Sequence, residues 1–87
     1  MNTLVGQTVL LDSKNSYVYV GVLESADGEF YVLTDADVHD LRDTPTLSRE
    51  QYVQRCREHG VAVNRARVWI AKAEVAGFSR LDDVVSG

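Results

Sequence analysis

The stretch Tyr17–Ser25, YVYVGVLES, is a run of β-branched and aromatic residues that is interrupted by one glycine, Gly21. Residues of these types favour strands, because their side chains pack well on a pleated surface. A glycine inside a strand usually marks a sharp bend or a bulge. The sequence therefore predicts a long strand that bends at Gly21 and serves two sheets.

Four further segments show the two-residue period that is typical of strands. They are residues 7–12, 29–34, 67–73 and 75–79. Turn-forming residues separate the first three strands, as SKNS at residues 13–16 and as ADG at residues 26–28. Five short strands with tight turns predict a mainly β fold, a small and strongly bent barrel.

The segment between the third and fourth predicted strands has helical signals instead. Ser48 lies three residues before Gln51, which is the spacing of a capping box. Gly60 is placed to end a helix, and His59 puts a basic group near the carbonyl end. We expect a helix over Arg49–His59. Only one narrow face of it is apolar, formed by Tyr52, Val53 and Cys56.

Length and composition indicate one small domain, residues 1–87, with 45% hydrophobic and 25% charged residues. A chain this short buries only about 60 to 65% of its unfolded surface, so a homo-oligomer is expected. No segment approaches the ~20 apolar residues of a membrane helix, and residues 1–5 lack the features of a signal peptide. The single Cys56 excludes an intrachain disulfide and a zinc ribbon within one chain. We expect a cytoplasmic protein without membrane contact.

Charge is distributed unevenly along the chain, whose net charge is -4. Residues 1–41 carry one base and seven acids, a balance of -6, whereas residues 42–72 carry seven bases and three acids, a balance of +4. An acidic protein is not a typical non-specific binder of nucleic acid. Two interpretations of this uneven distribution stay open. The acidic and basic faces can pair between subunits, or the basic face can bind an acidic partner. The favoured interpretation is that both faces are mostly solvated surface.

Two parts of the sequence resemble the motifs of Sm and Sm-like (LSm) proteins. The first comprises LVGQTV at residues 4–9, Gly21-Val22-Leu23, Asp27 and VLTDA at residues 32–36, and the second is VWIAKAEV at residues 68–75. The resemblance implies a five-stranded SH3-like (Sm-like) barrel in which about residues 37–66, with the helix, are an insertion in the variable loop. It also implies a homo-oligomeric ring, joined by strand four of one subunit and strand five of the next, that binds single-stranded RNA near its pore.

When the RNA-binding positions of the family are matched to this sequence one by one, several of them carry different residues. The family positions that stack on and read a base fall on Glu29 and Tyr31, and the Arg-Gly of the second motif is replaced around Lys72. Phe30 or Tyr31 can still offer a stacking face, and stacking tolerates any base. The candidate RNA-binding residues are Asp27, Phe30, Tyr31 and Lys72, together with Arg65 and Arg67 of the Arg-rich insertion.

Structural interpretations compete with these assignments. Asp27 can bond the amides of its own turn, as Asp commonly does. Tyr31 can be a packing or interface residue, and Trp69 is expected to fill a barrel or subunit boundary.

Three carboxylates and one imidazole gather in a cluster formed by Asp35, Asp37, His39 and Asp40. Such a cluster can hold a divalent cation. The residues required of a calcium loop are missing, however, and a zinc site would need more than one histidine. We therefore expect no metal and no cofactor, and we expect these residues to bond the loop, with Arg42 or an arginine of the next subunit as partner.

Catalysis has little support in the sequence. Cys56 and His59 share one face of the predicted helix, but nothing supplies an orienting group or an oxyanion hole. We therefore expect no enzyme activity. Two functions stay open: a ring-forming Sm-like module that binds single-stranded RNA, and an oligomeric structural module that has lost RNA binding. In the second, the helix Arg49–His59 docks a protein partner.

Overall fold

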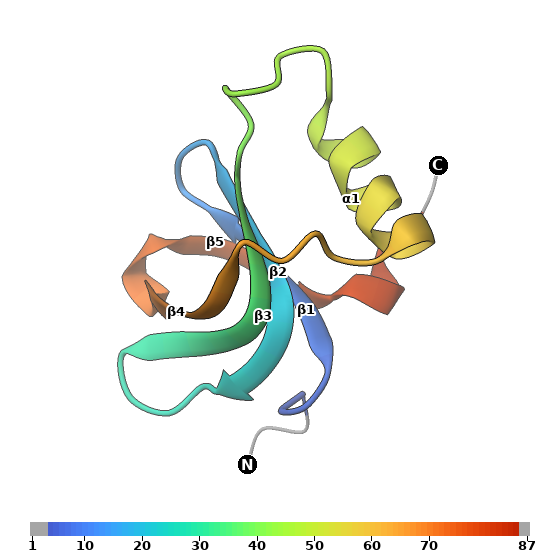
Figure 1. Cartoon of the computed structure of the whole chain (residues 1–87). Helices are drawn as coiled ribbons and strands as arrows, with labels where there is room; N and C mark the ends of the chain where they lie inside the picture. The colour runs from blue at the N-terminus through green and yellow to red at the C-terminus, as the bar shows by residue number, and fades with distance from the viewer. Residues whose placement is uncertain (1–3, 86–87) are drawn as a thin grey trace.

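The computed structural model describes residues 4–85, which form five strands, one α-helix and two short 3₁₀ helices (Figure 1). In chain order the elements are β1 (Thr8–Ser13), β2 (Tyr17–Ser25), β3 (Phe30–Asp40), α1 (Arg49–His59), β4 (Arg65–Ala71), η1 (Lys72–Glu74), β5 (Val75–Arg80) and η2 (Leu81–Asp83). The mainly β fold with five strands and one helix is confirmed. Residues 1–3 and 86–87 of the predicted domain lie outside the described residues.

All five strands belong to one antiparallel sheet with the order β4-β3-β2-β1-β5. The prediction that β2 serves two sheets is therefore wrong. β4 and β5 are joined by the three residues of η1, yet they lie at opposite edges of the sheet. The sheet curves strongly but is not closed (Figure 1).

The bend predicted at Gly21 coincides with a close approach of β2 to β3. A Cβ atom added to Gly21 would lie 2.9 Å from the Cβ of Ala36 and 3.0 Å from the carbonyl oxygen of Thr34. The β2–β3 register also shifts between Val20 and Val22. Glycine is required here because no larger residue fits at this separation.

Each face of the sheet carries its own hydrophobic cluster, because successive strand residues point to opposite sides. The inner cluster consists of Val9, Leu11, Leu23, Leu33, Ala36 and Ile70, inside the curve of the sheet. The outer cluster consists of Leu10, Val18, Val20 and Leu81 with Tyr52, Val53 and Cys56 of α1. Helix α1 therefore covers the outer face of β1 and β2 with the narrow apolar stripe that the sequence indicated.

Strand β3 is longer than predicted, since it runs to Asp40 rather than to Thr34. Its second half pairs with β2, so that His39 lies opposite Val18. Asp35 takes a positive φ of 48°, which interrupts the regular pairing. Polar composition suggested a loop, but these polar side chains have partners that only the folded chain supplies. The segment that connects β3 to α1 therefore begins after Asp40.

The ends of α1 are those predicted. The Ser48 side chain accepts a hydrogen bond from Gln51 N, and the Gln51 side chain accepts one from Ser48 N at 2.8 Å. Gly60 follows the helix with φ 85°, and its N–H donates to the carbonyl oxygen of Cys56. The local signals sufficed because capping involves only neighbouring residues.

A buried carboxylate fixes α1 to β3. Asp37 is 7% exposed, and its Oδ2 accepts a hydrogen bond from the Tyr52 hydroxyl at 2.7 Å. Its Oδ1 accepts one from Asn64 Nδ2 at 2.9 Å. The His39 ring stacks on the Tyr52 ring with 4.1 Å between centroids. Burying a carboxylate is unfavourable unless it is hydrogen-bonded, so both donors are needed.

We predict that Tyr52→Phe destabilises the protein by about 1–3 kcal/mol, because it leaves an oxygen of Asp37 buried without its donor. Urea unfolding followed by circular dichroism measures the loss. Tyr17→Phe is the matched control, since the Tyr17 ring stacks on Tyr19 near the surface. Equal stability of the two variants would contradict a structural role for the Tyr52 hydroxyl.

Candidate functional site

Four of the six predicted RNA-binding residues lie at one end of the sheet, where the turn between β2 and β3 meets η1. They are Asp27, Phe30, Tyr31 and Lys72. The backbone N–H of Lys72 donates to the carbonyl oxygen of Glu29 at 2.9 Å, and Phe30 pairs with Ala71. The tertiary structure thus joins residues that are about 45 positions apart in the sequence.

An open hollow of about 450 Å³ lies at this junction. It is lined by Gly28, Glu29, Phe30, Ala71, Lys72 and Ala73. Phe30 is 46% exposed, so its ring is available to a flat partner. Glu29 contributes a negative charge beside the ring, which opposes binding of phosphate groups.

Lys72 and Tyr31 are engaged within the chain. The ammonium group of Lys72 lies 5.2 Å from the centre of the Tyr31 ring and donates to the carbonyl oxygen of Ala26. The other neighbour of Tyr31 is Phe78, with 4.9 Å between ring centroids. Tyr31 therefore packs between Phe78 and Lys72 in the structure. The hydrogen bond to Ala26 fixes the Lys72 side chain beside the β2–β3 turn.

Arg65 and Arg67 lie apart from Lys72, further along β4. Arg67 is opposite Thr34 of β3, and its guanidinium makes two hydrogen bonds of 2.9 Å to the carboxylate of Glu24. Arg65 donates to the carbonyl oxygen of Asn64 at 3.0 Å. At about 3.3 Å per strand residue, Arg67 lies about 16 Å along the strand from Lys72. The structure does not assemble the three bases into one site.

Helix α1 lies over the opposite half of the sheet. Its buried side chains contact Leu10 and Val18, far from the turn between β2 and β3, and Arg49 makes two hydrogen bonds of 2.6 Å to Asp12 of β1. An open groove of about 700 Å³ follows its exposed side. The groove is lined by Arg49, Glu50, Gln51, Val53, Gln54, Arg55, Glu58, His59, Val84 and Val85. The helix arginines therefore cannot join Lys72 in one site of a single chain.

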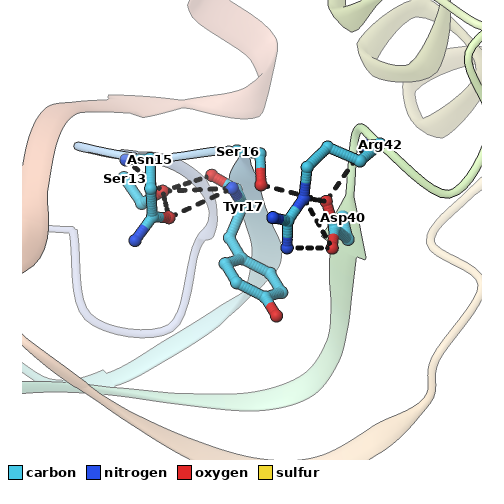
Figure 2. Close-up of polar contacts among 6 residues, drawn as sticks. All are labelled: Ser13, Asn15, Ser16, Tyr17, Asp40 and Arg42. Carbon is cyan, nitrogen blue, oxygen red and sulfur yellow. Dashed lines mark hydrogen bonds and ion pairs between the residues drawn. The ribbon is translucent and has the colours of Figure 1, made fainter.

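The acidic cluster joins loops rather than forming one site. Figure 2 shows Asp40 between the turn that follows β1 and the start of the insertion. Its Oδ1 accepts a hydrogen bond from Ser16 Oγ at 3.0 Å, and Arg42 Nη2 donates to Oδ2 at 2.8 Å. In the same turn, the Ser13 hydroxyl donates to the carbonyl oxygen of Tyr17 at 2.8 Å. The predicted partnership with Arg42 is confirmed.

The other members of the cluster point elsewhere. Asp35 is exposed, whereas Asp37 is buried against α1. Within residues 4–85, no group of three or more His, Cys, Asp or Glu side chains is placed to hold a metal ion. The positive φ of Asp35 interrupts the alternation along β3 and separates Asp35 from Asp37, whereas alternation puts Asp40 on the side opposite to Asp37.

Cys56 and His59 differ in their surroundings. Cys56 is 4% exposed, and burial raises the pKa of its thiol, which disfavours the nucleophilic thiolate. His59 is exposed, with its Nε2 3.8 Å from a carboxylate oxygen of Glu58. The pair lacks the geometry of a nucleophile and its base.

Two residues that matter in the structure carried no clear sequence signal. The side chain of Asn64 makes three hydrogen bonds, to Asp37 and to both backbone groups of Val38, at 2.9 to 3.0 Å. Trp69 was expected to fill a barrel or subunit boundary; it is 60% exposed on β4, so it does not fill the interior of the single chain. A lone asparagine in a loop and a lone tryptophan in a strand do not reveal their partners.

No protein-family model matches the chain, and no curated protein matches it either. None of the helices formed by residues 4–85 combines the length and apolar character required to cross a membrane.

The Asp40 contacts predict a specific response to acid. The hydrogen bonds from Arg42 hold the pKa of Asp40 well below its usual range. The stabilising contribution of Asp40 is therefore present above about pH 4 and is lost as the pH falls further. Asp40→Asn should weaken the dependence of stability on pH between about pH 5 and pH 2, as measured by urea unfolding.

Arg42→Ala is the companion variant, because it removes the largest cause of the lowered pKa. It should weaken the acid dependence in the same way. An unchanged slope in both variants would show that the carboxylate contributes nothing to acid sensitivity.

Proposed function

We propose that this chain is a subunit of an Sm-like homo-oligomeric ring, in which β4 of one copy pairs with β5 of the next. The observation that carries the proposal is the position of β4 and β5 at opposite edges of one open, curved sheet. Each edge strand is paired on one side only, so alternate backbone N–H and C=O groups face outward. Copies joined edge to edge satisfy these groups.

The composition of the two edges supports assembly. Natural proteins protect free edges with prolines and charged residues. The second half of β4, Val68 to Ala71, and β5 from Val75 to Ser79 contain neither, whereas the first half of β4 carries Arg65 and Arg67. No proline or charged residue in these two segments therefore hinders pairing with the edge strand of another copy. The short chain also supports assembly, because a small domain gains stability by burying surface between copies.

The resemblance to Sm-like proteins agrees with this arrangement. A ring of this kind requires strands four and five at opposite edges, as they are here. It also places the turn after strand two beside the connection between strands four and five, and Glu29 and Lys72 meet in that way. The proposal rests on these features of the fold.

Light scattering after size-exclusion chromatography tests the assembly. We expect a single oligomer of several copies at micromolar concentration, and a monomer for Ala76→Lys, because a lysine at this exposed position near the start of β5 puts a charge on the edge strand. Ala62→Lys, in the exposed loop before β4, is the matched control and should keep the mass of the parent. A monomeric parent at all concentrations would refute the ring.

Binding of single-stranded RNA is a second function, favoured by the exposed ring of Phe30 beside the hollow at the turn and η1. Stacking of one base on an aromatic ring contributes about 1–3 kcal/mol. The internal contacts of Lys72 and Arg67 and the charge of Glu29 weaken the electrostatic contribution. The site therefore favours weak, stacking-dependent binding, and assembly remains the principal proposal.

We predict that Phe30→Ala weakens binding of a labelled uridine-rich single-stranded RNA about tenfold in fluorescence anisotropy, because the stacking face is lost. Val63→Ala is the control, since Val63 is equally exposed but lies in the loop before β4. Equal affinities of the two variants would exclude Phe30 as a contact. Absence of binding by the parent at low salt would leave the assembly module alone.

A further inference from the structure

The only tryptophan of the chain lies exposed on an edge strand. Trp69 is 60% exposed, and its strand neighbours Val68 and Ile70 pack with the inner cluster. Because side chains alternate along a strand, Trp69 stands on the outer face of β4. A large aromatic side chain left in water at a free edge marks a surface suited to a partner.

The other edge strand, β5, carries small residues on its outer face. Gly77 of β5 pairs with Asp12, and Ser79 pairs with Leu10, so both β5 residues belong to the outer face. A Cβ atom added to Gly77 would lie 3.3 Å from Asp12 Oδ2. Gly77 therefore has no side chain of its own over its backbone, and the Asp12 carboxylate, which binds Arg49 at 2.6 Å, borders that space.

We infer that, in the proposed assembly, the Trp69 side chain of one copy covers Gly77 of the next copy, beside its Arg49. This inference rests on the proposed pairing of β4 with β5 and adds its register. An aromatic residue opposite a glycine covers the exposed backbone of a sheet. The Arg49 guanidinium, fixed by Asp12, gives the indole ring a cation at its edge or face.

Side-chain size supports this register along the strands. With Trp69 opposite Gly77, Arg67 lies opposite Ser79 and Ala66 opposite Arg80, so the three largest outward or edge side chains of these pairs each meet a small one. On the inner face, Val68 lies opposite Phe78. A shift of two residues keeps the faces matched but puts Ala71 opposite Gly77 and Trp69 opposite Ser79, so that the two smallest residues face each other.

Charge supports the same register. Arg65 of one copy then lies opposite Leu81, at the start of η2 of the next copy. The next residue of η2, Asp82, is an exposed carboxylate, whereas Asp83 pairs with Arg80 of its own chain at 2.7 Å. Arg65 thus lies near the negative charge of Asp82 across the interface.

Cysteine cross-linking tests the register in the full-length chain with Cys56→Ala. Ser79→Cys is combined in turn with Arg65→Cys, Arg67→Cys or Trp69→Cys, and the products are compared on gels with and without reductant. Directly opposed residues have Cβ atoms about 4.5–5.5 Å apart, whereas diagonal ones are about 7–8 Å apart, too far for a disulfide. We expect a ladder of linked chains only for the Arg67→Cys pair.

Tryptophan fluorescence gives an independent measurement on the unmodified chain. Dilution from the oligomer to the monomer should shift the emission to longer wavelength and raise quenching by iodide, because Trp69 becomes exposed. An oligomer whose tryptophan is quenched as readily as that of the monomer would overturn the inference. So would cross-linking of the Trp69→Cys or Arg65→Cys pair alone, or of none.

The two proposals fail in different ways. A parent chain that is monomeric at every concentration overturns the ring and the inference together. An oligomer of the expected mass without the Arg67→Cys ladder overturns only the register. Circular dichroism of each cysteine variant confirms that the sheet is folded.

Discussion

The close approach of β2 and β3 at Gly21 and Ala36 is the constraint on which the rest of the structure depends. With no Cβ on Gly21, the two longest strands bend together, and the sheet acquires an inner and an outer face. The inner face closes over its own cluster of apolar side chains. The outer face of β1 and β2 is apolar as well, and helix α1, from the segment between β3 and β4, covers it.

The attachment of α1 determines where the basic residues of the insertion lie. The buried hydrogen bonds of Asp37 to Tyr52 and Asn64 fix the helix and the following loop against β3. This position stabilises the outer cluster and directs the helix away from the end that carries Phe30 and Lys72. The apolar side of the helix therefore forms part of the outer cluster, and only its opposite side faces away from the sheet.

The charged groups explain why assembly is the stronger proposal. Arg67, Arg49 and Lys72 each have a partner within the chain, which weakens their attraction for a phosphate backbone. The described residues instead leave the outer backbone groups of two edge strands and the side chain of Trp69 exposed to water. Hydrogen-bonding groups and apolar surface of this type are satisfied by another sheet edge rather than by an anion.

The sequence by itself determined the features that depend on near neighbours. The strand period, the bend at Gly21 and both ends of α1 were predictable, because turns, caps and alternation involve residues a few positions apart. The tertiary structure alone decided the length of β3, since the partners of Asp37 and Asp40 come from other segments. It also separated Arg67 from Lys72 and left Trp69 in water. Those outcomes depend on strand register and long-range packing, which local sequence does not encode.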